Sequence, residues 1–499
     1  MLSIGIDSGT TSTRALVLNV ESGKVLHLAR QPHAFVEHLP HGHVEQSPDT
    51  WIEAAEKAIG ECLTQVGDQK KSITAIAVSA QQHGLVILDG RNRPLRAAKL
   101  WCDTSTAEEA DELNKVFTNA DGMIARTGNV IVPGYTAPKL LWLKRHEPAN
   151  FSRTETILLP HDYVNLWLTG ERQMEYGDAS GTGLMNVSER KWCEPLLDYI
   201  DRDLAEKLPA LHSSLQPVGL LRDALRKQWG LTGEVLVAAG SGDNMLGAIG
   251  TANIEKGAVT VSLGSSGTIY SFSDKPRSDV KGEIALFCDA TDHWLLLACT
   301  MNLGVAIERL QRLFGWDIAT LEANVAAISP GAAGLLFLPY LQGERMPNLP
   351  AASGVLHGLT NENMDPAHIA RAVVEGLTMG LAYGIKRMTD LGIEPTELRL
   401  TGGGSKSAVW RKLIADVFGI PVAGLKVADG AALGAAIQAA WTYCHVKGKP
   451  IALEELVRGC VKIDRKTRAE PRKENQAIYR ELRARQADLT RKLTAAGYL

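Results

Sequence analysis

The sequence is poor in cysteine and has no two cysteines at short spacing. Its seven cysteines are scattered along 499 residues, are odd in number and never form Cys-x-x-Cys. This usage is typical of reduced thiols and fits neither a disulfide framework nor a zinc site. The first apolar segment begins at residue 2, without the profile of a secretory signal. We therefore expect a cytoplasmic protein.

Long apolar runs and an excess of positive charge are also missing. No apolar run approaches the roughly 18 residues that a membrane-spanning helix requires, so we expect no membrane partner. The 53 Lys and Arg against 56 Asp and Glu leave a net charge of −3, which argues against a nucleic-acid partner. An apolar share of 45% is ordinary for a globular protein, and 499 residues suffice for two or three domains. The composition indicates an enzyme that acts on something small.

Two common nucleotide-binding loops are absent as well. The chain has no Gly-x-x-x-x-Gly-Lys-Ser/Thr loop and no Gly-x-Gly-x-x-Gly. It has instead two turns of small hydroxyl-bearing residues, at residues 7–12 and 262–268, each beside apolar β-branched segments. Glycine lets backbone N–H groups converge on an anion, and Ser and Thr hydroxyls add donors. Two ordinary hairpin turns are the alternative, but the pair favours two similar lobes that bind one nucleotide.

The first turn and a later run of glycines add chemistry to this prediction. Asp7 is the only acid of the first turn, and its carboxylate is a hard oxygen ligand where Mg²⁺ on a phosphate chain needs one. Gly402-Gly403-Gly404 follows a predicted strand at residues 398–401 and precedes a predicted helix at 407–418. Three adjacent glycines allow adenine or ribose to approach the backbone, whereas a plain strand-to-helix turn would need one. These residues favour a nucleotide and Mg²⁺ as ligands.

Asp243 is the best candidate for a general base. It lies in Gly240-Ser241-Gly242-Asp243-Asn244, at the start of a predicted helix over residues 245–249. An Asp at a helix start is most often an N-cap, and that alternative stays open. Phosphoryl transfer to an alcohol needs a carboxylate within hydrogen-bond reach of the attacking hydroxyl. In the context of the phosphate turns, the segment favours the base.

Two further segments offer polar groups for a sugar. Gln81-Gln82-His83 follows a predicted strand at residues 72–78 and presents amide and imidazole groups beside Gly84. Asp103, at the start of a loop, supplies a carboxylate acceptor for sugar hydroxyls. A structural turn histidine and an aspartate that caps the helix starting near Ser105 are the alternatives.

The order of predicted elements indicates two cycles of one architecture. Strands are predicted at residues 2–6, 12–19 and 24–30, and again at 258–263 and 268–272. Helices are predicted at 49–66, 302–314, 365–391 and 407–418, and an Ala-rich helix at 430–445 is suited to close packing on a sheet. A basic C-terminal helix carries one apolar stripe, at residues 478, 482, 489 and 493. Its interspersed acids favour a docked surface helix over a nucleic-acid arm.

Several longer stretches resemble one family. Residues 134–143 (GYTAPKLLWL), and residues 354–359 (GVLHGL) with 368–375 (HIARAVVE), are similar to the two signatures of the FGGY carbohydrate kinases, members of the actin-like ATPase superfamily. Residues 337–345 add a further similar run, and the resemblance covers essentially the whole chain. It implies an α/β fold of two actin-like (ribonuclease H-like) lobes, each a mixed sheet flanked by helices, with a cleft between them. We expect an N-terminal lobe over residues 1–240 that binds sugar and a C-terminal lobe over 241–499 that binds ATP.

The resemblance also implies roles for individual residues. Asp243 would be the catalytic base, and Asp7 would act on Mg²⁺, directly or through a water. The sugar would be surrounded by Gln82, His83, Asp103 and Asn244. The ATP phosphates and adenosine would lie against Thr10, Thr11, Ser12, Arg14, Gly264, Ser265, Gly403 and Gly404.

Within the family, the similarity points to members that phosphorylate a ketopentose, D-xylulose, to its 5-phosphate. His161 and Met346 stand where Lys and Thr are expected, which leaves the exact sugar open. A kinase for ribulose, glycerol or another polyol is one alternative, and an actin- or chaperone-like ATP-driven binding module is another. The partners expected are a small sugar and ATP, and a homodimer is one open assembly.

Overall fold

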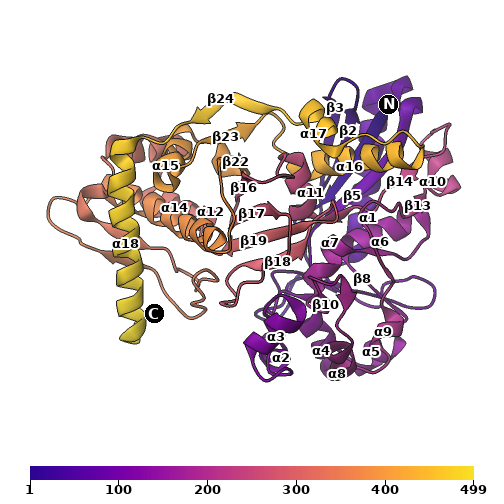
Figure 1. The fold of residues 1–499 in the computed structure, drawn as a ribbon, viewed down its shortest axis with the longest axis horizontal. Coiled ribbons are helices and arrows are strands. Elements are labelled where there is room, and N and C mark those ends of the chain that lie inside the picture. Colours follow the sequence, from indigo (N-terminus) through magenta and orange to yellow (C-terminus); the bar gives the residue numbers. More distant parts are fainter. The chain divides into compact units, whose positions relative to one another are not determined.

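The computed structural model describes residues 1–499 and divides by its internal contacts into two compact units. The first unit comprises Met1–Ile254, Phe272–Leu295 and Asp429–Lys462. The second comprises Glu255–Ser271, Leu296–Ala428 and Ile463–Leu499. Each unit contains strands of a seven-stranded mixed sheet and helices packed on it (Figure 1). The predicted α/β class is therefore confirmed.

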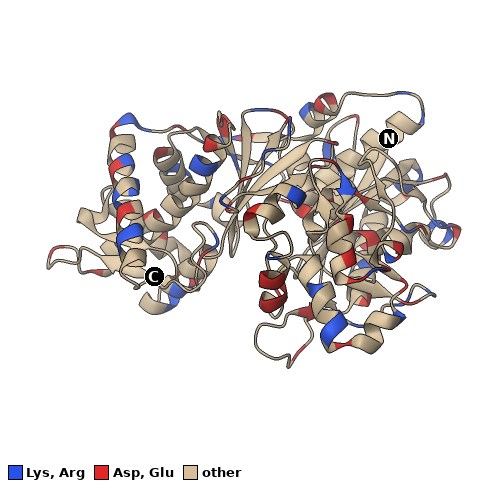
Figure 2. Cartoon of the chain, turned by 60° about the horizontal axis from the view of Figure 1, so that its bottom comes forward, with Lys and Arg blue, Asp and Glu red and all other residues tan.

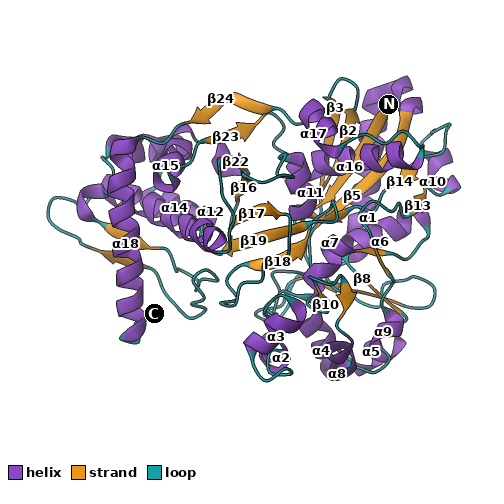
Figure 3. Cartoon of the chain, viewed as in Figure 1, coloured by secondary structure: helices purple, strands orange, loops and turns teal.

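The first unit begins with a β-meander that continues into a parallel arrangement. Its main sheet has the order β13-β14-β5-β1-β2-β3, with β15 also paired to β5. Strand β1 is antiparallel to β2 and parallel to β5. Helix α1 packs on β2 and β3, and helix α16 packs on β1, β2 and β5 (Figure 3).

The elements of the first unit have these bounds: β1 Leu2–Ser8, β2 Ser12–Asn19, β3 Lys24–Pro32, β4 Glu45–Gln46, α1 Pro48–Val66, β5 Ile73–Ala80, β6 Val86–Leu88, β7 Ala98–Lys99, α2 Ala107–Leu113, α3 Ala120–Thr127, α4 Thr136–His146, α5 Pro148–Arg153, β8 Thr156–Leu158, α6 Pro160–Thr169, β9 Met174–Glu175, α7 Tyr176–Ala179, β10 Met185–Asn186, β11 Lys191–Trp192, α8 Glu194–Ile200, α9 Leu204–Lys207, β12 Leu211–His212, β13 Gly219–Leu220, α10 Asp223–Gln228, β14 Leu236–Val237, β15 Ser241–Gly242, α11 Asp243–Gly250, β18 Ala285–Cys288, α16 Gly430–Val446 and α17 Leu453–Cys460.

Strand β1 is longer than the sequence predicts. It runs to Ser8, because Asp7 and Ser8 pair on one side with β2 and on the other with β5. Asp7 is therefore a strand residue at the edge of the first turn, and the turn itself is residues 9–11. The strand predicted over residues 12–19 is confirmed to the residue as β2.

Small residues allow α16 to lie directly on the first sheet and on α11. A Cβ at Gly5 in β1 would stand 1.9 Å from the carbonyl oxygen of Ala432, so only glycine admits the helix there. A Cβ at Gly434 would stand 1.8 Å from the carbonyl oxygen of Leu246 in α11. The close packing expected of this Ala-rich helix is thereby confirmed. A boundary at residue 240 would put α11 and α16 in the C-terminal lobe, whereas both helices belong to the first unit.

The second unit is built around strands paired in the order β19-β17-β16-β22-β23-β24. Its elements have these bounds: β16 Ala258–Leu263, β17 Gly267–Ser273, β19 Trp294–Thr300, α12 Gly304–Phe314, α13 Ile318–Ala327, β20 Leu336–Leu338, β21 Val355–His357, α14 Pro366–Asp390, β22 Glu397–Thr401, α15 Ala408–Phe418, β23 Val422–Leu425, β24 Ile463–Ala469 and α18 Lys473–Ala495. Four 3₁₀ turns complete the chain, at Gly67–Ser72, Ser180–Thr182, Ala332–Gly334 and Gly403–Lys406.

The C-terminal helix α18 docks on the second unit by its apolar stripe. Leu489 and Leu493 pack on a buried cluster that includes Leu338 and Tyr340, and Leu482 is itself buried. Blue and red residues alternate along this helix in Figure 2, where the C label marks its end. The predicted docked surface helix is confirmed. None of the helices combines the length and apolar character needed to cross a membrane.

Candidate active site

Asp243, Asn244 and Gln82 form one hydrogen-bonded row in the first unit. Asn244 Nδ2 donates to Asp243 Oδ1 and to Gln82 Oε1, both at 2.9 Å. Asp243 is the first residue of α11, with Gly242 at the N-cap position, whereas Gln82 follows β5. A Cβ at Gly242 would stand 2.6 Å from Gln82 Cγ, so glycine is what allows this approach. Three of the predicted site residues are thus in direct contact.

Two atoms of this row have capacity left for a ligand. Gln82 Nε2 is buried and makes no hydrogen bond within the protein, so a donor is available there. Burial raises the pKa of Asp243 to about 7, and the nearby charges of Asp7 and Asp178 act in the same direction. A carboxyl group with a pKa near the working pH is suited to accept a proton and release it again.

His83 takes part in the site through its backbone and its ring packing. Its φ of +65° lies in the left-handed region, which costs free energy for a residue with a side chain. Its carbonyl oxygen accepts from the buried Nζ of Lys139 at 2.7 Å and from Thr136 Oγ1 at 3.2 Å. Its ring lies 4.8 Å from that of Tyr135 and 5.8 Å from that of Phe287. The tertiary structure therefore holds a conformation that the sequence alone would disfavour.

Asp7 lies between a hydroxyl and a guanidinium. Its Oδ1 accepts from Ser79 Oγ at 3.0 Å and its Oδ2 from Arg14 Nη1 at 3.3 Å. Burial raises the pKa of Asp7, an effect that the charge of Arg14 and the bond from Ser79 oppose. Arg14 Nε also contacts Asp429 Oδ1 at 2.9 Å. Asp429, which follows Ala428 and precedes α16, was not predicted as a site residue.

The first turn is open to ligands on one side and anchored on the other. Thr11 is exposed, and Gly9 and Thr10 are half-buried. Ser12 is buried, and its Oγ accepts from Arg30 Nε at 3.0 Å. Thr10 is anchored twice, because its carbonyl oxygen accepts a bond from the buried Gln46 and its Oγ1 accepts one from the half-buried Trp101.

Asp103 lies in a different environment from Asp243. Its Oδ2 accepts from the Val44 amide at 2.8 Å and from Lys99 Nζ at 3.2 Å. Its Oδ1 accepts from the amide and the hydroxyl of Ser105, at 3.0 and 2.5 Å. Burial alone would raise the pKa of Asp103, but these hydrogen bonds and the Lys99 charge outweigh it and hold the pKa below its usual value. No contact with Asp243, Asn244 or Gln82 is present. The capping alternative is wrong as well, because the N-cap of α2 is Thr106, and at this helix start Asp103 bonds only the residue before the N-cap, Ser105.

His43, Glu45 and Asp103 offer three ligand atoms within 4.8 Å of one another. The ammonium of Lys99 already contacts all three, at 3.1 Å from His43 Nδ1, 3.4 Å from Glu45 Oε1 and 3.2 Å from Asp103 Oδ2. This cluster is therefore a neutralised charge network, with a lysine in the position of a cation.

A buried charged cluster near Asp243 escaped the sequence analysis. His161 in α6 contacts Asp178 in α7 through Nδ1 at 2.6 Å and Asp162 through Nε2 at 3.1 Å. Burial alone would lower the pKa of His161, but these carboxylates and Glu175 raise it to about 9. No spacing in the sequence marks Asp178 as a neighbour of Asp243, since the two belong to different elements.

The second unit holds the other predicted nucleotide residues. Gly264 follows β16, and its carbonyl oxygen accepts from the Gly304 amide at 3.1 Å, while that of Ser265 accepts from Val305 at 3.2 Å. The loop is thus seated on the first turn of α12. A Cβ at Gly304 would stand 2.5 Å from the oxygen of Gly264, so this seat requires glycine.

The triple-glycine loop lies beside this turn. Strands β16 and β22 pair in parallel, with Ser262 opposite Thr401, so their following loops leave the same edge of the sheet. Gly402 has a φ of +78°, and its Cβ would stand 2.7 Å from the carbonyl oxygen of Leu263. A Cβ at Gly404 would stand 2.9 Å from the Trp410 ring, whereas nothing lies within 4 Å of one at Gly403. The structure therefore brings the two predicted loops of this unit together.

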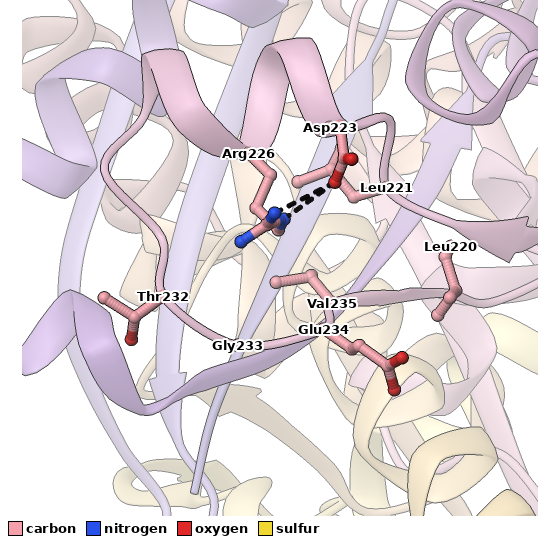
Figure 4. Close-up of a pocket in the computed structure, with 8 residues that line it drawn as sticks. All are labelled: Leu220, Leu221, Asp223, Arg226, Thr232, Gly233, Glu234 and Val235. Carbon is pink, nitrogen blue, oxygen red and sulfur yellow. Dashed lines mark hydrogen bonds and ion pairs between the residues drawn. The ribbon is translucent and has the colours of Figure 1, made fainter.

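Two surface cavities lie away from these residues. One, of about 460 Å³, is lined by residues of the segment 220–235, where the Arg226–Asp223 ion pair spans one side (Figure 4). The other, of about 390 Å³, lies between Trp441, His293 and Leu453. Neither contains a predicted site residue.

The chain is similar to known sugar kinases along its whole length. Residues 2–250 match the N-terminal domain of the FGGY family of carbohydrate kinases, and residues 259–443 match its C-terminal domain. A xylulose kinase of Haemophilus influenzae is 38% identical over 474 residues, which cover 94% of this chain and 95% of the relative.

Two solved structures extend the similarity to the fold. One from Brucella ovis, described as a xyloylose kinase, has a TM-score of 0.92 at 31% identity. The match covers 99% of this chain and 100% of the Brucella ovis chain. A gluconate kinase from Lactobacillus acidophilus has a TM-score of 0.91 at 24% identity, with 99% of this chain and 98% of that one covered. At that identity the second likeness concerns the fold alone. Together, these matches establish that the chain belongs to the FGGY family of carbohydrate kinases.

Proposed function

We propose that this chain transfers the γ-phosphate of ATP to a hydroxyl of D-xylulose and forms D-xylulose 5-phosphate and ADP. The observation that carries the proposal is the row of Asp243, Asn244 and Gln82 in the first unit, which joins a proton acceptor to an amide donor that has no partner in the protein. The curated relative at 38% identity is named a xylulose kinase, which favours this sugar.

Asp243 is proposed as the general base. The carboxylate accepts the proton of the attacking hydroxyl while that oxygen forms its bond to the γ-phosphorus and the bond to the ADP oxygen breaks. The pKa of about 7 keeps a substantial fraction of Asp243 ionised at neutral pH. Asn244 Nδ2 donates to Oδ1 of the carboxylate, and Oδ2 is proposed to accept from the hydroxyl. Gln82 Nε2 is proposed to donate to a second sugar oxygen.

His83 and Asp103 are also proposed to lie around the sugar. The backbone of His83 is held by Lys139 and its ring by aromatic neighbours, so it shapes the segment that carries Gln82. The oxygens of Asp103 already accept bonds within the chain. A direct contact of Asp103 with the sugar stays a prediction, and a role in shaping the loop is the alternative.

Each unit is proposed to contribute to ATP binding. In the first, Thr10, Thr11, Ser12 and Arg14 are proposed to bind phosphates, because the turn is rich in donors and Thr11 is exposed. In the second unit, two adjoining loops are proposed to contribute. We propose that phosphate binds at Gly264 and Ser265, and adenosine at Gly403 and Gly404. The open space at the Cβ position of Gly403 suits the approach of a flat ring.

Asp7 is proposed to hold Mg²⁺, directly or through a water. Its oxygens are hard donors, and each accepts only one side-chain bond in the protein, so they fit such an ion. The ion would supply charge stabilisation to the phosphates. A cytoplasmic location and a homodimeric assembly are further predictions of the sequence that belong to this proposal.

The identity of the sugar is the part of the proposal that the fold does not select, since a gluconate kinase shares it. The test is an ADP-release assay of the full chain with Mg-ATP and a panel of D-xylulose, D-ribulose, glycerol and gluconate. We expect the highest kcat/KM with D-xylulose and ³¹P NMR of the product to show a 5-phosphate. A higher kcat/KM with another panel member would overturn the sugar, and ADP release that no sugar stimulates would overturn the kinase proposal.

A further inference from the structure

Gln46, a residue of the short strand β4, has a fully buried side chain whose four hydrogen bonds reach four parts of the first unit. Its Nε2 donates to the Thr10 carbonyl oxygen at 2.7 Å and to His33 Nδ1 at 3.2 Å. Its Oε1 accepts from Trp51 Nε1 and from Gln81 Nε2, both at 3.0 Å. An amide has two N–H donors and two lone pairs, so this side chain is completely satisfied.

The chemistry of the partners fixes the orientation of the Gln46 amide. The Thr10 carbonyl can only accept, and the Trp51 indole can only donate, so Nε2 faces the first and Oε1 the second. Burial lowers the pKa of His33 to about 4, which keeps its ring neutral and leaves Nδ1 able to accept. Exchanging the amide atoms would break the bonds to Thr10 and Trp51.

The same amide joins the phosphate turn to the segment that carries Gln82. Gln81 donates its side chain to Gln46 and its backbone N–H to the Ser8 carbonyl at 3.0 Å. Gln81 is adjacent in the chain to Gln82, the proposed sugar donor. The path from Gln82 to the Thr10 carbonyl is thus one peptide unit, one side chain and the amide of Gln46, all of it buried up to Thr10.

Thr10 has a second anchor that fixes the direction of its hydroxyl proton. Trp101 Nε1 donates to Thr10 Oγ1 at 3.0 Å. Because an indole N–H cannot accept, the hydroxyl keeps its own proton for another acceptor, and a phosphate oxygen is such an acceptor. The position of Thr10 therefore decides where this donor points.

From these contacts we propose that Gln46 is a positioning residue that couples the sugar and nucleotide sites of the first unit. Sugar bound at Gln82 favours one position of the neighbouring Gln81. The hydrogen bonds of Gln46 pass this preference on to Thr10. The phosphates of the nucleotide therefore bind more tightly to the complex with sugar. By thermodynamic reciprocity the nucleotide strengthens sugar binding by the same factor. This inference rests on the proposed function of Gln82 and Thr10, and adds the element that connects them.

The test measures that factor by calorimetry of the full chain. A non-hydrolysable ATP analogue with Mg²⁺ is titrated with and without saturating D-xylulose. We expect the sugar to tighten analogue binding in the wild type by about 5- to 150-fold, the usual range of coupling between sites. In Gln46→Glu, which keeps the acceptor for Trp51 and Gln81 but replaces the donor to Thr10, we expect a factor below 2. The KM for ATP at saturating sugar should rise by the lost factor, with kcat within about threefold.

A second variant cuts the same path at another point. Gln81→Met removes the bond to Gln46 and leaves the other three partners of that amide in place, so it keeps the test valid if Gln46→Glu folds poorly. We expect the same loss of coupling, and no further loss in the double variant, because both changes break one connection. The matched control is Gln486→Glu, the same chemical change at a buried amide of the second unit that donates to the Phe337 and Gly376 carbonyls. It should keep the wild-type factor.

The outcomes separate this inference from the proposed function. A wild type that phosphorylates D-xylulose but shows no coupling, or variants of Gln46 and Gln81 that keep the wild-type factor, would overturn the role of Gln46 and leave the kinase proposal standing. A wild type that phosphorylates no sugar would overturn both.

Discussion

Two aspartates of the first unit, Asp243 and Asp103, differ in the charged groups that lie beside them. Asp103 accepts bonds from Val44, Lys99 and Ser105 on both oxygens, and its pKa lies below the usual value. Asp243 accepts a side-chain bond from Asn244 and backbone bonds that lower its pKa, but burial and the charges of Asp7 and Asp178 outweigh them and raise it to about 7. A carboxylate beside a cation stabilises structure, whereas one whose charge is destabilised by burial and nearby acids can exchange a proton.

The comparison teaches that the presence of an acid in a loop beside small residues does not identify a base. Both aspartates follow short apolar segments and both stand near a predicted helix start. The difference arises from Lys99, which neutralises Asp103, and from Asp7 and Asp178, which add negative charge around Asp243. Only the tertiary structure shows which acid has a cation beside it.

The largest effect is expected at the base itself. Asp243→Asn keeps the size of the side chain but cannot accept the proton, and loss of general-base catalysis costs about 10²–10⁴-fold in kcat. Steady-state ADP release with saturating sugar and ATP measures it, and an unchanged melting temperature is the control for folding. Near-normal turnover in the folded variant would make Asp243 a helix-terminal residue and reverse the comparison.

A slightly smaller loss of kcat is expected when the carboxylate of Asp7, the proposed Mg²⁺ ligand, is removed. Asp7→Ala should lower kcat by about 10²–10³-fold, the scale on which an enzyme loses rate with one charge-stabilising group. Activity should also respond less to the Mg²⁺ concentration, while the sugar affinity measured by calorimetry stays within about twofold. A collapse of sugar affinity with a normal Mg²⁺ response would show that Asp7 belongs to the sugar site.

Asn244, which bridges Asp243 and Gln82, should matter less for activity than Asp243 or Asp7. Asn244→Ala removes the side chain that bonds both, and a hydrogen bond to a charged group contributes about 1.5–3 kcal/mol, so kcat/KM for the sugar should fall about 10–100-fold. Most of this loss should be in KM, because the variant keeps the carboxylate. A loss confined to kcat would assign Asn244 to the chemical step and not to sugar binding.

The smallest effect on rate is expected at Asp103. Asp103→Asn leaves Lys99 without its closest carboxylate, and breaking a buried ion pair costs about 3–5 kcal/mol of folding free energy. Chemical denaturation measures that loss, whereas kcat of the folded fraction should change less than tenfold. A normal stability with a KM for sugar raised tenfold or more would instead establish Asp103 as a sugar ligand.

Much of the fold could be predicted from local patterns. Strands β2 and β16 and the Ala-rich helix α16 are where the sequence predicts them, because alternating apolar residues and small-residue stripes determine such elements. The sequence also identified the loops that contain Asp243, Gln82 and Gly404. These loops follow strands, where chain reversals place polar residues together.

The connections between the loops could not be predicted. The contacts of Thr10 with Gln46 and Trp101, and of Arg14 with Asp429, join residues far apart in sequence with no shared motif. The left-handed backbone of His83 is equally unexpected, because bonds from Lys139 and Thr136 stabilise it only after folding. Such contacts depend on the register of β1, β2 and β5, which local spacing does not determine.

The pH dependence of kcat/KM for D-xylulose tests the claim that Asp243 is the base most directly. Since the base must be ionised, kcat/KM should rise tenfold per pH unit at low pH and level off above a pH of about 7, the value to which burial and neighbouring acids raise the pKa of Asp243. Asp103→Asn should keep this break, and the residual rate of Asp243→Asn should lack it. A wild-type profile without a break near pH 7, or a break that persists in Asp243→Asn, would contradict the assignment.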